Sequence, residues 1–206
     1  MRLSSLAPLV LVLLPLPALA QDLQELLAKG PVVLMETDAK GRFSQATAII
    51  AIEQPIEKVW AISTDFARFK DVMPKVVKSD VIEVAATESV KKAGQRQIDL
   101  TLEIEVPGSN PEYTFRYTID DAKREMAGQW QSGDLKGSTT RWRLVPAGPS
   151  RTLLHYSAAT KNFSAMAASL EDDQQTITVG VNVSAALATV KAVKRKAEAA
   201  SEAPAK

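Results

Sequence analysis

The stretch that decides the fold reads Ile98-Asp-Leu-Thr-Leu-Glu-Ile104, with an apolar side chain at every second position. The next stretch repeats the pattern with larger side chains, Tyr113-Thr-Phe-Arg-Tyr-Thr-Ile119. A period of two residues is that of a β-strand with one buried face and one wet face. The pair therefore predicts neighbouring antiparallel strands that place aliphatic and aromatic side chains on one side of a sheet.

The same pattern continues on both sides of this pair. Four more segments between Lys75 and Thr160 alternate or run apolar, and clusters of Gly, Pro, Ser and Asn separate the segments as turns. Repeated alternation over short segments is typical of an antiparallel meander that is covered on one side. The six expected strands of this meander cover residues 76–85, 94–106, 112–121, 124–131, 138–146 and 151–159.

Shorter elements precede the meander. A hairpin is expected first, with strands over 32–37 and 43–53 around a turn at 38–41. Two short helices should follow, over 55–64 and 65–72. The first of them opens with a proline, which suits the first turn of a helix because its missing N–H has no partner there.

The cover of the sheet is the last long segment. Residues 172–198 contain one turn-forming residue, Gly180, and their apolar side chains recur at helical spacing. This segment is also rich in Ala and Ser, which would leave volume between helix and sheet. A further short helix is expected over 22–29. Together these features predict an α+β helix-grip fold, in which an antiparallel sheet wraps around a long C-terminal helix.

The first twenty residues have the pattern of a cleavable secretory signal peptide. Arg2 precedes an apolar run that is too short and too rich in proline to span a bilayer comfortably. The run ends in Ala18-Leu-Ala20, so cleavage is expected after Ala20 and the protein should be secreted or periplasmic. The expected domains are a signal peptide at 1–20, a ligand-binding domain at 21–196 and a disordered Ala/Glu/Lys tail at 197–206.

Composition narrows the classes of partner. The formal net charge is +1, and a nucleic-acid footprint would need a strongly basic face, so no nucleic acid is expected. One histidine and no cysteine also make a zinc site improbable, and no metal or cofactor is expected. One basic cluster is either a solvated helix end or a transient contact with an anionic membrane surface. Its members are Lys191, Lys194, Arg195 and Lys196.

The segment from Ala48 to Pro74 contains a helix start Pro55-x-x-x-Val59-Trp60, an Asp-aromatic step at Asp65-Phe66 and a closing Phe69-x-x-x-Met73-Pro74. It resembles the opening of START-like (SRPBCC) domains, in the polyketide cyclase/dehydrase and lipid-transport group. Residues 137–146 and 151–156 are similar to the last two strands of such domains. The resemblance covers about 32–193 and implies a helix-grip fold that holds a hydrophobic ligand between sheet and helix.

The candidate site is the apolar and aromatic face that should look at the C-terminal helix. On the residues alone, these side chains either fill the core or line a pocket with a few polar tips. The resemblance favours the pocket, and with it an exported soluble protein that binds or carries a lipid, a quinone or a sterol-like compound. The candidate cavity-lining residues are Leu100, Leu102, Tyr113, Phe115, Tyr117, Trp130, Trp142, Leu144, Val183 and Leu187.

A second hypothesis is an enzyme of the cyclase or dehydratase type that uses the same cavity. It would need an acid or base inside the pocket. His155 and the tyrosines are the plausible donors, but a single strand histidine without an obvious partner is more often structural, so no catalytic residue is assigned. The third hypothesis is a membrane-surface interaction module that uses the basic helix end.

Overall fold

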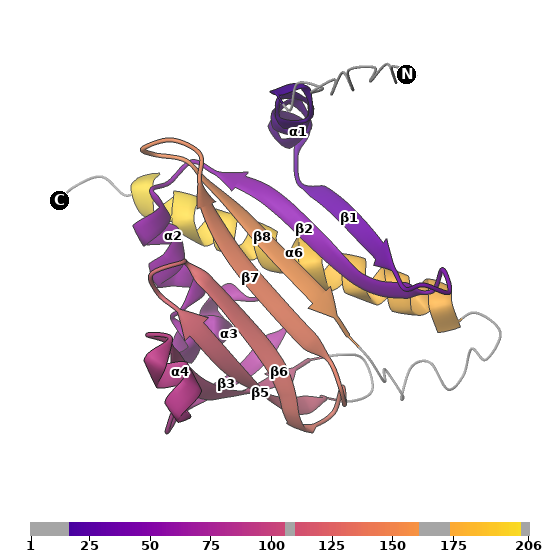
Figure 1. Cartoon of the computed structure of the whole chain (residues 1–206), viewed down its shortest axis with the longest axis vertical. Helices are drawn as coiled ribbons and strands as arrows, with labels where there is room; N and C mark the ends of the chain where they lie inside the picture. Colours follow the sequence, from indigo (N-terminus) through magenta and orange to yellow (C-terminus); the bar gives the residue numbers. More distant parts are fainter. Residues whose placement is uncertain (1–16, 106–109, 161–173, 203–206) are drawn as a thin grey trace, which may run out of the picture.

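One antiparallel sheet and one long helix form most of the molecule (Figure 1). The computed structural model describes residues 17–105, 110–160 and 174–202. Within these ranges eight strands form one sheet in the order β1-β2-β8-β7-β6-β5-β4-β3, and neighbouring strands are antiparallel. The strands are β1 (Val32–Thr37), β2 (Phe43–Ile52), β3 (Val76–Val84), β4 (Arg96–Ile104), β5 (Glu112–Asp120), β6 (Glu125–Gly133), β7 (Thr139–Pro146) and β8 (Thr152–Ala159).

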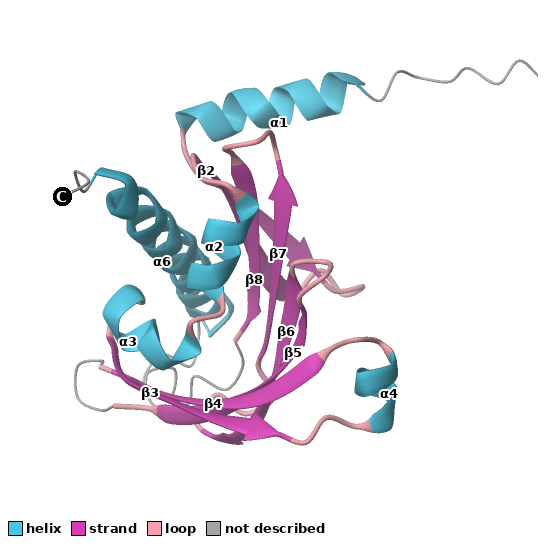
Figure 2. Cartoon of the chain, turned by 90° about the vertical axis from the view of Figure 1, so that its left-hand side faces the viewer, coloured by secondary structure: helices cyan, strands magenta, loops and turns pink. Residues whose placement is uncertain are grey.

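Helices cover one side of this sheet. Figure 2 shows α2, α3 and α6 on the same side, with β3 and β4 curling beneath them. The long helix α6 packs along β2 and β8, so the sheet wraps around it and the predicted helix-grip fold is confirmed. The helices are α1 (Pro17–Lys29), α2 (Ile56–Ser63), the 3-10 turn η1 (Phe66–Arg68), α3 (Phe69–Val72), α4 (Glu88–Lys92) and α6 (Gln174–Glu202).

The predicted strands are all present, and their ends agree with the expected ones to about two residues, which is the usual uncertainty of such boundaries. The short helix α4 was not expected. It forms one exposed turn between β3 and β4, where Lys91 pairs with Glu88 at 3.0 Å. Such a single charged turn lacks the apolar face by which a helix is found in a sequence.

The C-terminal helix continues past the expected domain boundary at 196. Residues 197–202, expected as part of a disordered tail at 197–206, are helical, and Ala197 is fully buried. Polar contacts fix this end: the Lys194 ammonium donates to the Ala51 carbonyl at 2.8 Å and to the Glu198 carboxylate at 2.7 Å. The backbone N–H of Glu53 donates to the same carboxylate at 3.1 Å. The Ala-rich composition therefore extends a helix here, and residues 203–206 lie outside the described residues.

Helix α1 runs through the point at which cleavage is expected, after Ala20. Leu27 near its end is buried, whereas Leu26 is half exposed. Residues 1–16, which hold most of the expected signal peptide, lie outside the described residues. Cleavage and export therefore stay predictions.

One described helix is long and apolar enough, by length and composition, to cross a membrane: residues Thr176–Ala199 of α6. The core helix of a water-soluble protein passes the same test. Ala186, Val190 and Val193 on this helix are fully buried in the cluster of core residues, and 28% of the apolar stretch is buried in all.

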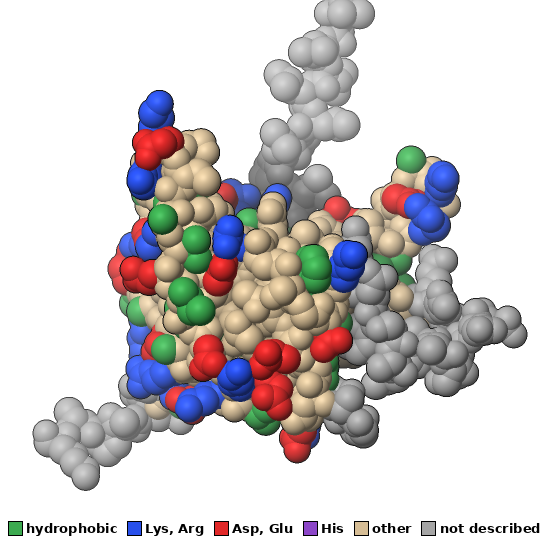
Figure 3. All heavy atoms as spheres, turned by 90° about the horizontal axis from the view of Figure 1, so that it is seen from below, with side chains coloured by type: hydrophobic (Ala, Val, Ile, Leu, Met, Phe, Trp, Pro, Cys, Tyr) green, Lys and Arg blue, Asp and Glu red, His purple; other side chains and the backbone are tan. Residues whose placement is uncertain are grey.

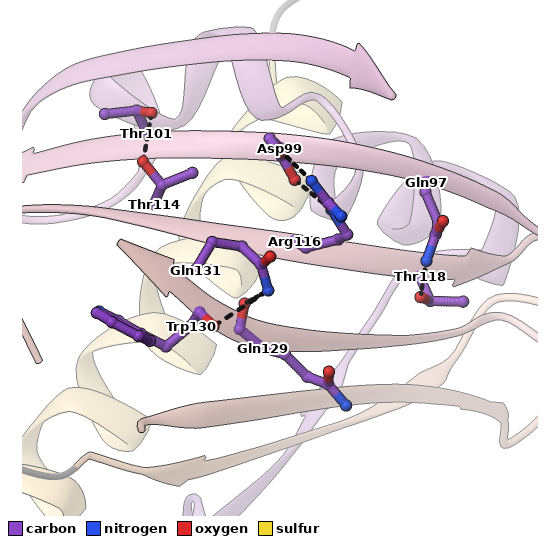
Figure 4. A network of polar contacts seen from close by, with 9 residues as sticks. All are labelled: Gln97, Asp99, Thr101, Thr114, Arg116, Thr118, Gln129, Trp130 and Gln131. Atoms are coloured by element: carbon purple, nitrogen blue, oxygen red, sulfur yellow. Dashed lines mark hydrogen bonds and ion pairs between the residues drawn. The ribbon is translucent and has the colours of Figure 1, made fainter. Parts of the chain in front are cut away.

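The two faces of the sheet differ as the alternation predicts. Along β4, Ile98 and Leu100 lie in the core, while Asp99 and Thr101 point to the opposite face. That opposite face carries polar cross-strand pairs between β4 and β5 (Figure 4). The pairs are Asp99–Arg116 with two hydrogen bonds of 2.8 and 2.7 Å, Thr101–Thr114 at 2.8 Å and Gln97–Thr118 at 3.1 Å. The ionic groups of Asp99 and Arg116 thus lie outside the space between sheet and helix.

Candidate functional site

A cavity of about 200 Å³ lies between the sheet and α6, toward the N-terminal half of that helix. Strands β4, β5, β7 and β8 form one wall, α6 forms another, and α3 with the residues after it closes a side. The lining residues are Phe69, Met73, Pro74, Val76, Leu102, Ile104, Pro111, Tyr113, Phe115, Tyr117, Leu135, Ser138, Thr140, Trp142, Tyr156, Thr160, Val181, Ala185, Ala188 and Thr189.

Strand alternation places the aromatic part of the wall. Tyr113, Phe115 and Tyr117 are two residues apart on β5, so all three point to the helix side. Their rings contact one another edge to face or tilted, with centroids 5.5 and 6.3 Å apart. Across the cavity wall, the rings of Trp142 and Tyr156 meet edge to face at 4.6 Å. These geometries are favoured between aromatic rings and stabilise the wall.

Small side chains on α6 leave the space open. Ala185 and Ala188 are three residues apart and Val181 lies one turn earlier, so they share the helix face that lines the cavity. An alanine extends no further than its Cβ, and the volume that a leucine would fill at these positions belongs to the cavity.

The polar tips inside the cavity are mostly tyrosine hydroxyls. The chain contains three tyrosines, and all three line this cavity. Burial raises the pKa of Tyr113, Tyr117 and Tyr156, so each hydroxyl keeps its proton at neutral pH. The Thr140 hydroxyl donates to the Tyr117 hydroxyl oxygen at 3.2 Å. These groups can donate hydrogen bonds, but they are poor general bases.

The indole N–H of Trp142 is the unsatisfied group of the wall. Its side chain is 2% exposed, and the Nε1 atom has no hydrogen-bond partner. Burial raises the pKa of the nearby Tyr117 hydroxyl, and contacts with Thr140 and then with this indole act in the opposite direction. A buried donor without an acceptor is uncommon and calls for an explanation.

Half of the residues expected to line the cavity do so. Leu102, Tyr113, Phe115, Tyr117 and Trp142 are among the lining residues.

Leu100 and Leu144 are buried deeper in the core. The Trp130 indole donates to the carbonyls of the β6–β7 turn, Gly133 at 3.2 Å and Asp134 at 2.8 Å, instead of entering the cavity. Val183 and Leu187 are half-buried on a neighbouring face of α6. These five residues are therefore not among the described lining residues of this cavity. Size and apolarity select core positions as readily as cavity walls.

Several lining residues were not predicted, although strand alternation in the sequence indicates some of them. Thr140 and Ser138 precede Trp142 at two-residue steps, so the same alternation places them on the inner face. Tyr156 is an aromatic residue on the last strand and could have been found in the same way. Ala185 and Ala188 belong to the small residues of this helix that were expected to leave volume, but periodicity does not single them out, because the helix is apolar on several faces.

His155 lies on the far face of the sheet. Its neighbour Tyr156 lines the cavity, so alternation turns His155 away from it. The imidazole is half-buried opposite Arg143 of β7, and its pKa is lowered mainly by burial and further by that positive charge. Described residues hold no cluster of three or more His, Cys, Asp or Glu side chains that could bind a metal. The best candidate base of the enzyme hypothesis therefore does not reach the cavity.

Comparisons with known proteins agree with this architecture. A comparison with curated protein sequences finds no match. Among solved structures, the chain is similar to the Zhui aromatase/cyclase from Streptomyces, with a TM-score of 0.58 and 19% identity over 77% of this chain and 96% of that one. It is also similar to a START superfamily protein from Mycobacterium smegmatis, with a TM-score of 0.56 and 17% identity over 76% and 99% of the two chains.

A third similar structure is a STAR-related lipid transfer protein from Xanthomonas axonopodis, with a TM-score of 0.53 and 13% identity over 81% of this chain and 98% of that one. At such identities the likeness is one of fold. The family model for polyketide cyclase / dehydrase and lipid transport matches residues 52–185, which is more than half of the chain. The match includes α2, the meander and the start of α6 as far as Ala185, and the chain belongs to this family.

Proposed function

We propose that this protein is exported and binds or carries a hydrophobic small molecule, such as a lipid, a quinone or a sterol-like compound. The observation that carries the proposal is the cavity between sheet and α6, whose wall is mainly aliphatic and aromatic. Ligand sites typically combine such a wall with a few polar groups that fix orientation. The names of two similar structures, an aromatase/cyclase and a lipid transfer protein, are consistent with an organic ligand.

The size of the cavity limits what it encloses. At about 200 Å³ it is smaller than the roughly 300–1,000 Å³ of sites for drug-sized ligands. It would hold a ring system or one part of a longer molecule, while a complete phospholipid would not fit inside. A ligand of this size gains affinity mainly by removing apolar surface from water.

Catalysis remains the alternative use of the same cavity. A cyclase or dehydratase would need a group that takes or gives a proton next to the ligand. With His155 on the far face, the tyrosines are the titratable side chains among the described lining residues, and burial keeps them protonated. They would orient a carbonyl by hydrogen bonding, which favours binding over proton abstraction.

Contact with a membrane surface stays a separate prediction. In the basic cluster, Lys194 is already held by the Ala51 carbonyl and Glu198, whereas Lys191, Arg195 and Lys196 are exposed. Co-sedimentation with anionic liposomes at low and high salt would test it, since binding driven by charge should fade as salt rises.

The proposed function is tested on protein exported by its native host. Native mass spectrometry should show a bound small molecule, and the mass of the protein should place its N-terminus at Gln21. Ala188→Leu should remove the bound molecule, because the added side chain occupies the cavity. Ser184→Leu is the matched control: it makes a similar addition to an exposed position of the same helix and should keep the ligand.

Both variants would first be compared with the parent by circular dichroism and thermal unfolding. A protein that is isolated empty, and that binds no member of a panel of lipids, quinones and sterols, would contradict the binding function. An exported protein that still begins at Met1 would contradict the cleavage alone.

A further inference from the structure

We infer that Leu135, in the turn between β6 and β7, closes one end of the cavity and thereby limits the length of the ligand. The inference rests on the proposed function, because it concerns how the same cavity selects its ligand. Three observations carry it: the position of Leu135, its backbone conformation and the contacts that hold its turn.

Leu135 is the inward-pointing residue of an exposed turn. The other residues of the segment 131–137 are exposed, whereas Leu135 is half-buried and packs against the core cluster. Its side chain is the part of this turn that lines the cavity. A leucine that leaves the surface of a turn in this way removes apolar area from water and occupies space that a ligand could otherwise use.

The strand register places this turn at one end of the cavity. Val76 at the start of β3 pairs with Ile104 at the end of β4, and Tyr113 at the start of β5 pairs with Gly133, just before the turn. Val76 and Ile104 are half-buried lining residues, while Trp142, further along the sheet, is 2% exposed. Burial of the wall therefore increases away from the turn, which identifies the turn with the end nearer to solvent.

The backbone of Leu135 is in a conformation that leucine disfavours. Its φ is +63°, in the left-handed region, where the Cβ of an ordinary residue crowds the backbone. The turn has the same handedness at Gly133 and Gly137, with φ of +79° and +80°, and glycine adopts such angles without penalty. Of the described non-glycine residues with positive φ, Leu135 is the apolar one, beside Lys75 and Arg124. A leucine held in such a conformation indicates that its side chain has a role at this position.

Hydrogen bonds hold the turn on both sides of Leu135. The Trp130 indole donates to the Asp134 carbonyl at 2.8 Å, and the Asp134 N–H donates to the Glu112 carbonyl at 2.9 Å. In return, the Glu112 N–H donates to the Asp134 carboxylate at 3.1 Å. The Ser138 N–H closes the turn onto the Leu135 carbonyl at 3.0 Å. Leu135 is therefore a fixed stop, and Trp130, which lies outside the cavity, is a positioning residue for it.

The surface on this side of the molecule agrees with a closed end. Figure 3 views the molecule from below, the side on which β5 and β6 lie in Figure 1, and its hydrophobic side chains are scattered among acidic and basic ones. An apolar cavity that continued to the surface would be expected to gather hydrophobic side chains around its opening. A ligand that grows toward Leu135 would thus meet the leucine side chain before it meets water.

The experiment measures the longest chain that the cavity accepts. The neutral fluorescent probe N-phenyl-1-naphthylamine would be bound to the full chain and displaced by linear primary alcohols from hexanol to dodecanol. Each added CH₂ should tighten binding by about fourfold while it enters the cavity. Once the chain reaches the stop, further CH₂ groups should add little. The alcohol at which the affinity levels off is the length limit.

Two substitutions of Leu135 separate the volume of its side chain from the strain of its backbone. Leu135→Ala and Leu135→Gly should both move the length limit to longer alcohols by about two to three carbons, because both empty the space beyond Cβ. Leu135→Gly should also unfold at a higher urea concentration than Leu135→Ala, since glycine alone relieves the left-handed strain. Circular dichroism would confirm that both variants are folded.

Lys75→Gly is the matched control. Lys75 has nearly the same φ, +67°, but its side chain is exposed, pairs with Glu105 at 3.2 Å and is not among the described lining residues. The substitution relieves a similar strain without emptying the cavity, so the length limit should stay that of the parent.

Trp130→Phe tests the positioning role of the indole. It removes the N–H that holds the turn and should move the length limit in the same direction as Leu135→Ala, by a smaller amount. The double variant Trp130→Phe/Leu135→Ala should have the same limit as Leu135→Ala alone, because Trp130 acts through the leucine side chain. A purely structural role of Trp130 would lower the stability and leave the limit unchanged.

The outcomes separate this inference from the proposed function. If neither the naphthylamine nor the alcohols bind the parent protein, the proposed function fails and the inference fails with it. If the parent shows no length limit, or if Leu135→Ala and Leu135→Gly keep the limit of the parent, binding stands and the stop at Leu135 is overturned. A limit that moves in the Leu135 variants but not in Trp130→Phe overturns the positioning role alone.

Discussion

Asn182 of α6 and Thr160 at the end of β8 bind each other through two hydrogen bonds. The Thr160 backbone N–H donates to Asn182 Oδ1 at 2.7 Å, and Asn182 Nδ2 donates to the Thr160 carbonyl at 3.3 Å. The same amide also donates to the Thr178 carbonyl one turn earlier at 2.9 Å. Asn182 is fully buried, and both Thr160 and the neighbouring Val181 line the cavity. A single side chain thus joins the helix to the sheet at the cavity.

Asn182→Ala should lower the free energy of unfolding by about 2 kcal/mol, because it leaves backbone groups of Thr160 unpaired. Urea denaturation followed by circular dichroism would measure the change. Ser184→Ala, on the exposed face of the same helix, should stay within about 0.5 kcal/mol of the parent. Equal stabilities for the two variants would show that the Asn182 contacts are dispensable.

Gly128→Ala should change the shape of the cavity, because Gly128 packs against Thr140 and Tyr117 of its wall. A Cβ on Gly128 would lie 2.6 Å from the Thr140 hydroxyl oxygen and 2.8 Å from the Tyr117 ring. The ring must move, so we expect about 1–3 kcal/mol of destabilisation, typical of overpacking, together with weaker binding of the co-purified ligand. Urea denaturation and native mass spectrometry would measure the two effects. Unchanged binding would mean that the Tyr117 ring position does not matter for the ligand.

Gly180→Ala should stabilise the protein, in contrast to Gly128→Ala. Gly180 lies in α6, is exposed, and has no atom within 4 Å of the position of an added Cβ. Alanine is the better helix former, so the free energy of unfolding should rise by about 0.5–1 kcal/mol. Denaturation with urea would test this, and a decrease in stability would indicate a contact at this position that the structure does not contain.

Stability should depend on pH through His155, the one histidine of the chain. Burial and then the Arg143 charge lower its pKa in the folded state, so the unfolded chain binds the proton more readily. The contribution of His155 to the free energy of unfolding is therefore complete above the unfolded pKa of about 6.5. It is lost as the pH falls from that value to below the lowered pKa of the folded state. The imidazole resonance would report the pKa, and His155→Gln should flatten the stability profile between about pH 7 and pH 5.

The Asp99–Arg116 pair should contribute little and should not affect the ligand. Its two hydrogen bonds are well formed, but the side chains are 21% and 37% exposed on the far face of the sheet. A double-mutant cycle with Asp99→Ala and Arg116→Ala should give a coupling below about 1 kcal/mol. Loss of the co-purified ligand in either single variant, seen by native mass spectrometry, would contradict the separation of the two faces.

Period-two alternation predicts most of the fold, because it reports directly on which face of a strand is buried. The inner positions of β4 and β5 follow from it without further information, and so does Trp142. Trp130 shows where the pattern is insufficient. The register of β5 and β6 shifts between Thr114 and Phe115, and the indole N–H finds carbonyls in the adjacent turn. Neither feature leaves a signature in a list of apolar residues.

The helix wall was harder to predict for a different reason. Periodicity identified α6, but Val183 and Leu187 are larger and more apolar than Ala185 and Ala188, and the larger residues were expected to face the ligand. A cavity wall needs the opposite choice, since small side chains create the space that large ones would fill. None of the described lining residues is charged, but these residues come from several strands and helices. No single segment of the sequence therefore reveals that the wall is uncharged.

Helix α6 divides its contacts between two roles along its length. Residues from Val181 to Thr189 border the cavity, whereas Val193 and Ala197 pack into the filled core. Substitutions in the first part can alter what is recognised while the second part holds the scaffold together. Libraries that randomise the cavity-facing positions of this helix should therefore yield many folded proteins with new preferences. The same separation would let natural variants of such a scaffold change their cargo over time without passing through unfolded forms.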